Sequence, residues 1–583
     1  MRRTLASSGF SWFAFLVFIT AGLGAQTNVL TSRNDISRDG LNSTETVLNQ
    51  ANVNRASFGK ICSAVVDGQL FAQPLVVSAK GKNVVDVVTM NDSVYTIDGS
   101  NCNQINHASL IPPDEQATPC MDLNGRCGVI IPLIGALATP VIDISTNTIY
   151  VSTETESTSR PCQANHASTC FIHRLHALDL STLEEKFNGP AVISGSYLSA
   201  TFNPKQHIQR PGLLLLPGVM LNGDSAVYLG FSAIDGFGKP GVSTPQGWLF
   251  RYDAGDLSSA PIAWSSTPNG EGGGTWQSGS GIAAGIDSPN GQTFLYVNTG
   301  DGTFDVNDGG VDYGDSFVKL TTSLTTVPNG YFTPFNQACL NPYDLDFGSG
   351  GVLLTPNVGS KFYAVTASKT GAVFVMDRAN PGGFNAPKNH ACPGTGTNNN
   401  QEYFRGATRP YFTTAAYWNL HLYLTPLQLP LTRYQLSLSC NPGPICTTGT
   451  DTSKVEFGFA SPSISSSGNT TGTAILWAQS GNGWPPLQNG PEPAVLYAMD
   501  AEHVAPHNTV PELWDSTQCP ARDTPGNANK FVAPTIANGM VYLGTMDPTD
   551  STNTRGQLDV FGLTSAPCGS KPESQYPKSL SPP

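Results

Sequence analysis

A cluster of five aspartates is the part of the sequence whose residue types best suit metal binding. The five carboxylates fall within a single glycine-containing stretch: Asp301, Asp305, Asp308, Asp312 and Asp315. Carboxylate oxygens on a flexible loop are the ligands that Ca²⁺ prefers in proteins. The spacing is not that of an EF-hand, because the D-x-[DN]-x-[DN]-G order is missing. The cluster therefore predicts either a Ca²⁺ site or a solvated acidic loop.

Several other kinds of reactive site are disfavoured because their motifs are missing from the sequence. The nine histidines form no H-E-x-x-H or H-x-H pattern, which argues against a zinc hydrolase. No G-x-S-x-G turn lies between a strand and a helix, so an α/β-type serine hydrolase is not expected. No C-x-x-C occurs, which argues against zinc ribbons, thioredoxin-type sites and covalent c-type haem.

The twelve cysteines fall into neighbouring couples along the chain. These couples are Cys62/Cys102, Cys120/Cys127, Cys162/Cys170, Cys339/Cys392, Cys440/Cys446 and Cys519/Cys568. In an oxidising compartment such couples can form disulfides that hold long loops. The sequence alone does not fix their connectivity.

The composition indicates a folded protein built of short strands. The 583 residues include 60 Gly, 44 Pro and 27 Phe, and only 13% of them are charged. Many turn residues beside many aromatic residues favour an all-β protein over a helical bundle or a disordered chain. The formal net charge of −13 provides no basic surface for phosphates, which argues against a nucleic-acid partner.

A degenerate repeat indicates how these strands are organised. A unit opens with a small residue, often followed by Pro, continues with a Val-Tyr-Val type of strand and ends in an aromatic or apolar strand with Asp. Ala138–Asp143, Thr148–Ser152 and Leu175–Asp179 form one such unit. Eight unit openings run from Ala72 to Ala533, about 66 residues apart. Small sheets arranged radially bury both faces and leave few edges, so we expect an all-β propeller. Eight blades are the expected count, seven are possible, and two adjacent β-sandwiches are the alternative fold.

The two ends of the repeat region are expected to meet. The last unit lacks one strand, and the N-terminal stretch Gly59–Val66 could supply it and close the ring. Residues near Ile61 would then lie beside residues near Val560. The propeller would span residues 26–563 as a single domain, and the Ser- and Pro-rich tail, residues 564–583, is expected to be disordered.

Residues 1–25 have the layout of a secretory signal peptide. Arg2 and Arg3 precede the apolar stretch Phe10–Leu23, and small residues follow up to an expected cleavage point after Ala25. The apolar stretch is shorter than the roughly 20 residues needed to span a bilayer, and an uncleaved membrane anchor is the alternative. The mature protein is therefore expected to be secreted or periplasmic, with no transmembrane segment after signal removal.

The repeats resemble those of the quinoprotein alcohol dehydrogenase-like propellers, whose units are called PQQ repeats. The Ala-x-Pro openings, the Val-Tyr-Val centres and the ending Leu496–Asp500 carry this likeness. The stretches Asn34–Gly40 and Val66–Pro74 resemble those of secreted bacterial propellers with no settled activity. The resemblance covers the chain from about Asn28 to Leu563 and implies the fold, but one fold hosts both enzymes and binding scaffolds.

In active members of that family, pyrroloquinoline quinone lies in the funnel of the ring with Ca²⁺ beside it. Gly272–Trp276 is similar to the turn that carries the stacking Trp, which implies a cofactor-binding role for Trp276. Asn298–Asp301 is similar to the turn that carries an Asn ligand of the metal, with Asp301 in place of that Asn. The structural alternatives are a Trp that fills a blade junction and an Asp that caps a tight turn.

A third stretch, Asp344–Phe347, is similar to the turn that carries the catalytic base. The resemblance implies that Asp346 is the base and that Asp344 is a metal ligand, and the alternative is a pair of solvated rim residues. The chain departs from the family pattern because it has no adjacent cysteines and no clear match for the Glu ligand. The dehydrogenase hypothesis requires Trp276, Asp301 and Asp346 to converge on the funnel.

Two functions of different classes follow from these patterns. The first is a monomeric binding or scaffold propeller that grips a protein or carbohydrate with its rim loops. The long insertions Ser100–Gly135, Gly382–Gly406 and Cys440–Gly458 favour it, because recognition loops extend from rigid frames. The second is a dehydrogenase of an alcohol or sugar that depends on pyrroloquinoline quinone and Ca²⁺.

Overall fold

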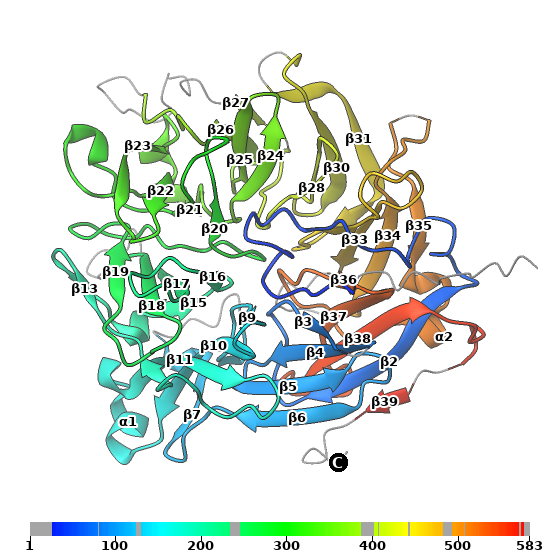
Figure 1. The fold of residues 1–583 in the computed structure, drawn as a ribbon, viewed down its shortest axis with the longest axis horizontal. Helices are drawn as coiled ribbons and strands as arrows, with labels where there is room; N and C mark the ends of the chain where they lie inside the picture. Colours follow the sequence, from blue (N-terminus) through cyan, green and yellow to red (C-terminus); the bar gives the residue numbers. More distant parts are fainter. Residues whose placement is uncertain are drawn as a thin grey trace, which may run out of the picture.

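Eight antiparallel sheets are arranged around a common axis, as the repeat predicts (Figure 1). The computed structural model describes residues 26–79, 81–123, 130–233, 245–385, 402–405, 407–440, 444–481, 492–506, 508–570 and 573–575. The predicted signal peptide lies outside these residues. The prediction of an all-β, eight-bladed propeller is confirmed, and the two-sandwich alternative is wrong.

The strands of each blade run antiparallel from the axis outward. Blade 1 comprises β3 (Leu75–Ala79), β4 (Lys82–Val88), β5 (Ser93–Asp98) and β6 (Gln104–Ser109). Blade 2 comprises β9 (Val141–Asp143), β10 (Thr148–Ser157), β11 (Phe171–Asp179) and β12 (Ala191–Val192), extended by β7 (Glu115–Pro119) and β8 (Leu133–Ile134). Blade 3 comprises β15 (His207–Gln209), β16 (Leu214–Leu216), β17 (Ala226–Ala233), β18 (Trp248–Asp253) and β19 (Ile262–Ser265), with the hairpin β13 (Ser196–Tyr197) and β14 (Ala200–Thr201) nearby. Blade 4 comprises β20 (Ala283–Gly285), β21 (Phe294–Asn298), β22 (Phe317–Thr321) and β23 (Thr326–Phe332).

The remaining blades follow the same plan. Blade 5 comprises β24 (Leu353–Val358), β25 (Lys361–Ala367), β26 (Ala372–Asp377) and β27 (Glu402–Arg405). Blade 6 comprises β28 (Ala416–Trp418), β29 (His421–Leu424), β30 (Leu429–Leu436) and β31 (Ile445–Phe457). Blade 7 comprises β32 (Ser463–Ser465), β33 (Ile475–Ser480), β34 (Val495–Asp500) and β35 (Glu512–Asp515). Blade 8 comprises β36 (Thr535–Ala537), β37 (Met540–Met546), β38 (Gly556–Leu563) and β2 (Phe58–Val66). The three insertions predicted as rim loops each hold the outermost strand of a blade, namely β6, β27 and β31, which the sequence pattern did not reveal.

The repeated terminal Asp of the units closes the turn that follows the third strand of a blade. Its carboxylate accepts a hydrogen bond from the backbone N–H two residues later, which is an Asx-turn. This contact is 2.8–3.0 Å long at Asp98, Asp179, Asp253, Asp377 and Asp500. The aromatic-Asp ending of the repeat is thus a turn signal.

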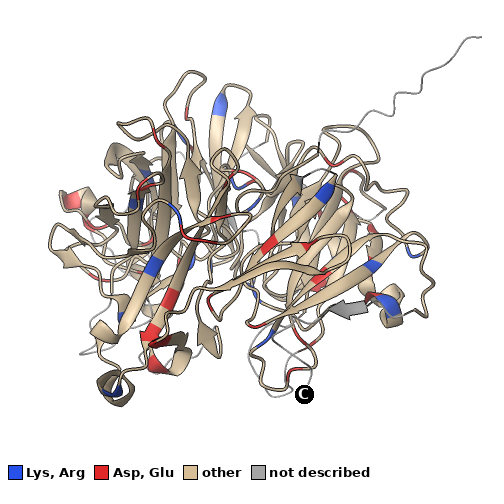
Figure 2. Ribbon diagram, turned by 60° about the horizontal axis from the view of Figure 1, so that its bottom comes forward, with Lys and Arg blue, Asp and Glu red and all other residues tan. Residues whose placement is uncertain are grey.

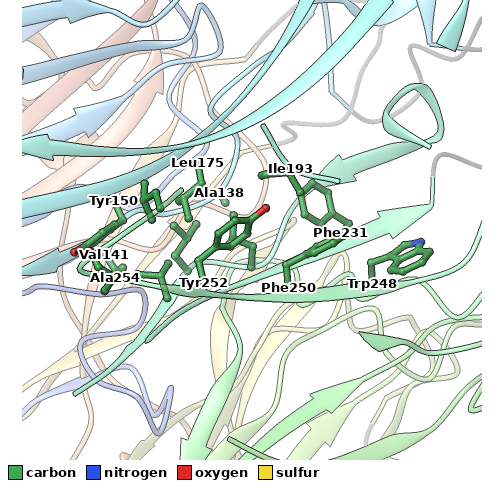
Figure 3. Packing of buried hydrophobic residues seen from close by; sticks show 14 of the residues in the cluster. Ala138, Val141, Tyr150, Leu175, Ile193, Phe231, Trp248, Phe250, Tyr252 and Ala254 are labelled. Carbon is green, nitrogen blue, oxygen red and sulfur yellow. Dashed lines mark hydrogen bonds between the residues drawn. The ribbon is translucent and has the colours of Figure 1, made fainter. Parts of the chain in front are cut away.

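Apolar side chains of neighbouring blades pack together between the sheets (Figure 3). Between blades 2 and 3, Tyr150 and Leu175 face Phe231, Trp248 and Phe250, and all five are fully buried. Full burial of one such side chain stabilises the fold by roughly 2 kcal/mol. The Val-Tyr-Val centres of the repeat therefore supply the core.

The segments that lead into the first strands of successive blades are joined by hydrogen bonds around the whole ring. Moving from blade 1 to blade 8 and back to blade 1, the joining pairs are Gln73–Thr139, Leu213–Thr139, Gly212–Ser280, Ser278–Ser349, Ser349–Tyr411, Thr413–Ala460, Ser461–Phe531 and Thr535–Pro74. These contacts are 2.7–3.1 Å long and involve backbone groups or Ser and Thr hydroxyls. The ring is therefore continuous.

The N-terminal strand closes the ring, as expected. β2 pairs antiparallel with β38, and Cys62 lies opposite Val560. Asp559 of β38 is fully buried and accepts a hydrogen bond of 2.9 Å from the Ser63 hydroxyl of β2. The disulfide Cys62–Cys102 then ties this strand to blade 1.

A second closure was not anticipated from the sequence. Residues 29–42, here called the N-terminal belt, pass the first strands of all eight blades in order. The belt contacts, from blade 1 to blade 8, are Val29–Val76, Leu30–Ile142, Thr31–Leu213, Ile36–Ala284, Ser37–Leu354, Asp39–Tyr417, Gly40–Ile464 and Asn42–Ile536. Within the belt, β1 (Leu41–Asn42) pairs with β32. In Figure 1 the belt is the dark blue segment near the centre of the ring.

Two buried arginines fasten the belt to opposite sides of the ring. Arg38 donates to the carbonyls of Leu213 and Ile282, in blades 3 and 4, at 3.1 and 2.9 Å. Arg33 donates to the carbonyls of Ala415 and Pro462, beside blades 6 and 7, at 2.6 and 2.5 Å. Both guanidinium groups lie in the interior with no exposed surface.

Four of the six expected disulfides lie among the described residues: Cys62–Cys102, Cys162–Cys170, Cys440–Cys446 and Cys519–Cys568. The other two couples each include a cysteine outside the described residues. The described part of the chain contains no helix long and apolar enough to cross a membrane.

The tail after Leu563 differs in part from the expected disorder. The bond from Cys568 to Cys519 brings it back to the propeller, and β39 (Glu573–Gln575) pairs in parallel with β2. The free edge of β2 thus binds this part of the tail, while residues 571–572 and 576–583 lie outside the described residues.

Candidate functional site

The expected site residues lie close together near one end of the ring axis. The belt contacts residues within the first strands, such as Ala284 in β20 and Leu354 in β24. Trp276 and Asp346 lie before these same two strands in the chain, and Asp301 follows β21. The residues that the sequence singled out therefore come together at the funnel end of the axis.

Three aspartates form a compact acidic triad there. Asp301, Asp315 and Asp346 each place one carboxylate oxygen within 4.8 Å of the other two. The Asp301 backbone N–H donates to Asp346 Oδ1 at 2.8 Å, and the Phe347 backbone N–H donates to Asp315 Oδ1 at 3.0 Å. These backbone contacts fix two of the carboxylates before any ligand arrives.

The composition of the triad differs from the set that the resemblance implied. Asp315 takes part, whereas Asp344 lies outside it with 83% of its side chain exposed. Lys369 bridges Asp344 and Asp346, with both nitrogen–oxygen distances 2.5 Å. The five aspartates of the acidic stretch therefore do not form one site. Asp301 and Asp315 belong to the triad, whereas Asp305 accepts a hydrogen bond from the Asp312 N–H and stabilises only its own turn.

The charges of the triad are poorly compensated. Burial, followed by the charges of Asp346 and Asp315, raises the pKa of Asp301 to about 10, and burial raises that of Asp315 well above its usual value. Asp301 Oδ1 has no hydrogen-bond partner among the described residues. A divalent cation would relieve this repulsion and satisfy the unpaired oxygen.

Gly300 allows the triad to form. A Cβ atom at this position would lie 2.2 Å from Asp346 Oδ1 and 3.0 Å from Trp276 Cδ1. Only glycine lets the Asp346 carboxylate and the Trp276 ring approach the Asp301 backbone so closely.

The Trp276 ring is half-buried, and other groups of the chain lie against it. The Arg210 guanidinium lies over it at 5.5 Å and over the Phe531 ring at 4.2 Å. Trp276 also packs against an apolar cluster that includes Leu137 and Ile208. The cavity beside Arg210 and Phe531 measures about 30 Å³, enough for one water, whereas ligand pockets measure roughly 300–1,000 Å³.

Aromatic rings and cations alternate around the rest of the funnel. Phe412, Phe459 and Phe531, which lie before the first strands of blades 6, 7 and 8, form a row with ring centroids 5.1 and 5.3 Å apart. Lys530 lies over the Phe459 ring, and burial and the charge of Arg210 lower its pKa to about 7. Such cation–π contacts hold cations in a largely buried place.

The arrangement fits a divalent cation better than a quinone. Three carboxylates with one unpaired buried oxygen are suitable ligands for Ca²⁺. A flat quinone would need the Trp276 surface that Arg210 and the apolar cluster use. The residues therefore fit the metal but do not fit the quinone in this arrangement.

Figure 2 shows acidic and basic residues interspersed over the strands and loops of the blades. Substitution of a charged residue outside the funnel can therefore serve as the control for substitution of a charged residue at the site. One example is Asp308, which is exposed in the same loop as Asp301 and Asp315.

Two solved structures that are similar to this chain are quinohemoprotein alcohol dehydrogenases. The quinohemoprotein alcohol dehydrogenase from Comamonas testosteroni superposes with a TM-score of 0.56 at 15% identity, over 96% of this chain and 82% of that one. The quinohemoprotein alcohol dehydrogenase ADHIIG from Pseudomonas putida HK5 gives 0.54 at 12% identity, over 94% and 82%. No family model and no curated protein sequence matches the chain. The chain thus has the eight-bladed propeller fold of the quinoprotein alcohol dehydrogenases, the fold that its PQQ-like repeats indicated.

Proposed function

We propose that the chain is an exported, monomeric binding propeller whose funnel takes Ca²⁺ and, through it, an oxygen-rich ligand such as a carbohydrate. The observation that carries this proposal is the acidic triad with its unpaired Asp301 oxygen beside a Trp276 ring that Arg210 covers. This combination favours a bound cation over a stacked cofactor.

Each residue of the triad has a defined part in the proposed binding. Asp301, Asp315 and Asp346 would hold the cation, and Ca²⁺ takes six to eight oxygen ligands, so positions remain for ligand hydroxyls. Asp301 is the partly exposed member and would face the ligand, while Asp315 is fully buried. Lys369 would hold Asp346 in place through its 2.5 Å contact.

The neighbouring rim offers a surface for a sugar ring. Tyr343 is 72% exposed and precedes Asp344, which shares Lys369 with the triad. Asn341, two residues earlier, exchanges two hydrogen bonds of 2.9 Å with the Gly302 backbone. An aromatic side chain thus stands at the edge of the acidic triad, where its apolar face could pack on a sugar.

The location of the protein is part of the same proposal. Four disulfides among the described residues agree with an oxidising compartment, and the sequence of residues 1–25 predicts a signal peptide. We place the protein in a periplasm or outside the cell.

Calcium titration of the chelator-treated mature chain by calorimetry tests the proposal. We expect one Ca²⁺ site that is lost in Asp346→Asn and retained in Asp308→Asn. Calcium-dependent retention on immobilised polysaccharides, lost in Tyr343→Ala, would then support the carbohydrate. Absence of a Ca²⁺ site, or a site that Asp346→Asn leaves intact, would contradict the proposal, and retention on a protein ligand alone would contradict its carbohydrate part.

The second candidate is a quinone-dependent dehydrogenase of an alcohol or sugar. It is favoured by the convergence of Trp276, Asp301 and Asp346 on one end of the ring. In that case Arg210 must leave the Trp276 ring to admit the quinone. Dye reduction with added pyrroloquinoline quinone and Ca²⁺, lost in Asp346→Asn, would establish this function in place of the binding propeller.

A further inference from the structure

A second group of metal-ligating side chains lies outside the funnel, on the extension of blade 2. Asp122 belongs to the short helix η1 (Cys120–Asp122), Glu156 lies near the end of β10, and His166 follows α1 (Arg160–Asn165). One ligand atom of each lies within 4.8 Å of the other two. Three separate segments thus bring two carboxylates and one imidazole together.

The imidazole is oriented by one carboxylate and faces the other. His166 Nδ1 lies 2.6 Å from Glu156 Oε1, so this nitrogen donates to the carboxylate. His166 Nε2 then carries the free lone pair, and it lies 3.6 Å from Asp122 Oδ1. Metal-bound histidines commonly donate their other ring N–H to a carboxylate in this way.

The backbone at His166 is held from several sides. Its φ is +46°, the left-handed conformation, and its N–H donates to the Cys162 carbonyl at 2.9 Å. The disulfide Cys162–Cys170 closes the loop that contains it, and Lys205 donates to the His166 carbonyl. The ring is therefore positioned without any ion, which reduces the cost of binding one.

Glu156 supplies an independent sign that a cation belongs here. Its side chain is fully buried, yet its Oε2 atom has no hydrogen-bond partner among the described residues. A buried carboxylate oxygen without a donor is costly, and the charge of a cation on the neighbouring imidazole would lower that cost.

We propose that Asp122 and His166 bind a divalent transition-metal cation while Glu156 orients the imidazole, with Zn²⁺ as the ion that suits this set of residues. Two ligands on a tetrahedral Zn²⁺ with bonds of about 2.0–2.2 Å lie about 3.3–3.6 Å apart, which matches the separation of His166 Nε2 and Asp122 Oδ1. Glu156 accepts from the other ring nitrogen through Oε1 and so orients the imidazole towards the ion from outside its ligand shell. Asp122 and His166 are 22% and 32% exposed, so solvent can supply the remaining ligands.

This site and the funnel triad should select different ions. The triad has only oxygen ligands, which suit Ca²⁺, whereas an imidazole nitrogen favours Zn²⁺. The two sites share no residue, so either can fail while the other holds.

Zinc titration of the chelator-treated mature chain, with Ca²⁺ present in excess, tests the proposal. We expect one Zn²⁺ site, absent from His166→Asn and from Asp122→Asn and weakened about 10- to 100-fold in Glu156→Gln. Asparagine is chosen at position 166 because it tolerates the left-handed conformation, so the loop can keep its fold. His503→Gln is the matched control, since His503 also pairs with a carboxylate, Asp500, at 2.9 Å on the surface.

A spectroscopic measurement separates this site from nonspecific binding. The X-ray absorption spectrum of the zinc-loaded protein should show one imidazole among mainly oxygen ligands, and Asp346→Asn should leave it unchanged. The proposal is overturned if no Zn²⁺ binds, if His166→Asn binds it as the unmodified chain does, or if the spectrum contains no imidazole.

Discussion

Replacing Arg33 by Lys tests whether the N-terminal belt holds the ring closed. Arg33 is fully buried and reaches two carbonyls, those of Ala415 and Pro462, on neighbouring blades. Burial lowers its pKa to about 10, so it keeps its charge at neutral pH. Lysine also keeps the charge but lacks the planar fork, and one carbonyl therefore loses its donor.

An unsatisfied buried carbonyl costs about 1–3 kcal/mol. Because the belt contacts every blade, we expect it to detach before the ring opens, so this cost should appear in the unfolding barrier. The unfolding rate in urea, followed by tryptophan fluorescence, should rise about 5- to 150-fold. Arg55→Lys, a change at an exposed position, should leave the rate unaltered. A rate for Arg33→Lys within twofold of the unmodified chain would refute the reasoning.

Three further predictions concern other parts of the molecule. Burial raises the pKa of Asp86 to about 7. The stabilising contribution of its protonated carboxyl is therefore complete below about pH 4 and is lost as the pH rises to about 7. Asp86→Asn should remove up to about 4 kcal/mol of this pH dependence, measured as the melting temperature from pH 4 to 8. Gly300→Ala should push Asp346 aside and lower Ca²⁺ affinity at least tenfold by calorimetry, and unchanged affinity would count against the triad as the site. Replacing both Cys62 and Cys102 by Ser removes a disulfide whose cysteines are 40 residues apart, and it should reduce the free energy of unfolding measured in urea by about 4 kcal/mol. An unchanged free energy would show that β2 needs no covalent bond to blade 1.

The fold could be predicted from the sequence because its signals are local and repeated. Each blade carries the same strand and Asx-turn pattern, so the weak signal of any one unit is reinforced by the others. The missing last strand then indicated that Gly59–Val66 closes the ring, which the pairing of β2 with β38 confirms. The outermost strands were missed because β6, for example, has no fully buried residue and hence no apolar pattern.

The belt and the two candidate sites depend on contacts that no local pattern encodes. Belt residues 29–42 mostly contribute single backbone contacts, which leave no periodicity in the sequence. Asp315 joins the triad only because the loop after β21 folds back on itself, and Arg210 covers Trp276 from another blade. Likewise, His166 meets its carboxylates across 44 and 10 residues, so no zinc motif was visible.

The proposed function depends most on what occupies the funnel. A crystal structure of the mature chain grown with both Ca²⁺ and pyrroloquinoline quinone tests this directly. We predict a cation bound by Asp301, Asp315 and Asp346, with the Arg210 guanidinium still over the Trp276 ring. A quinone stacked on Trp276, with Arg210 displaced, would contradict the binding-propeller account and establish the cofactor site of a dehydrogenase.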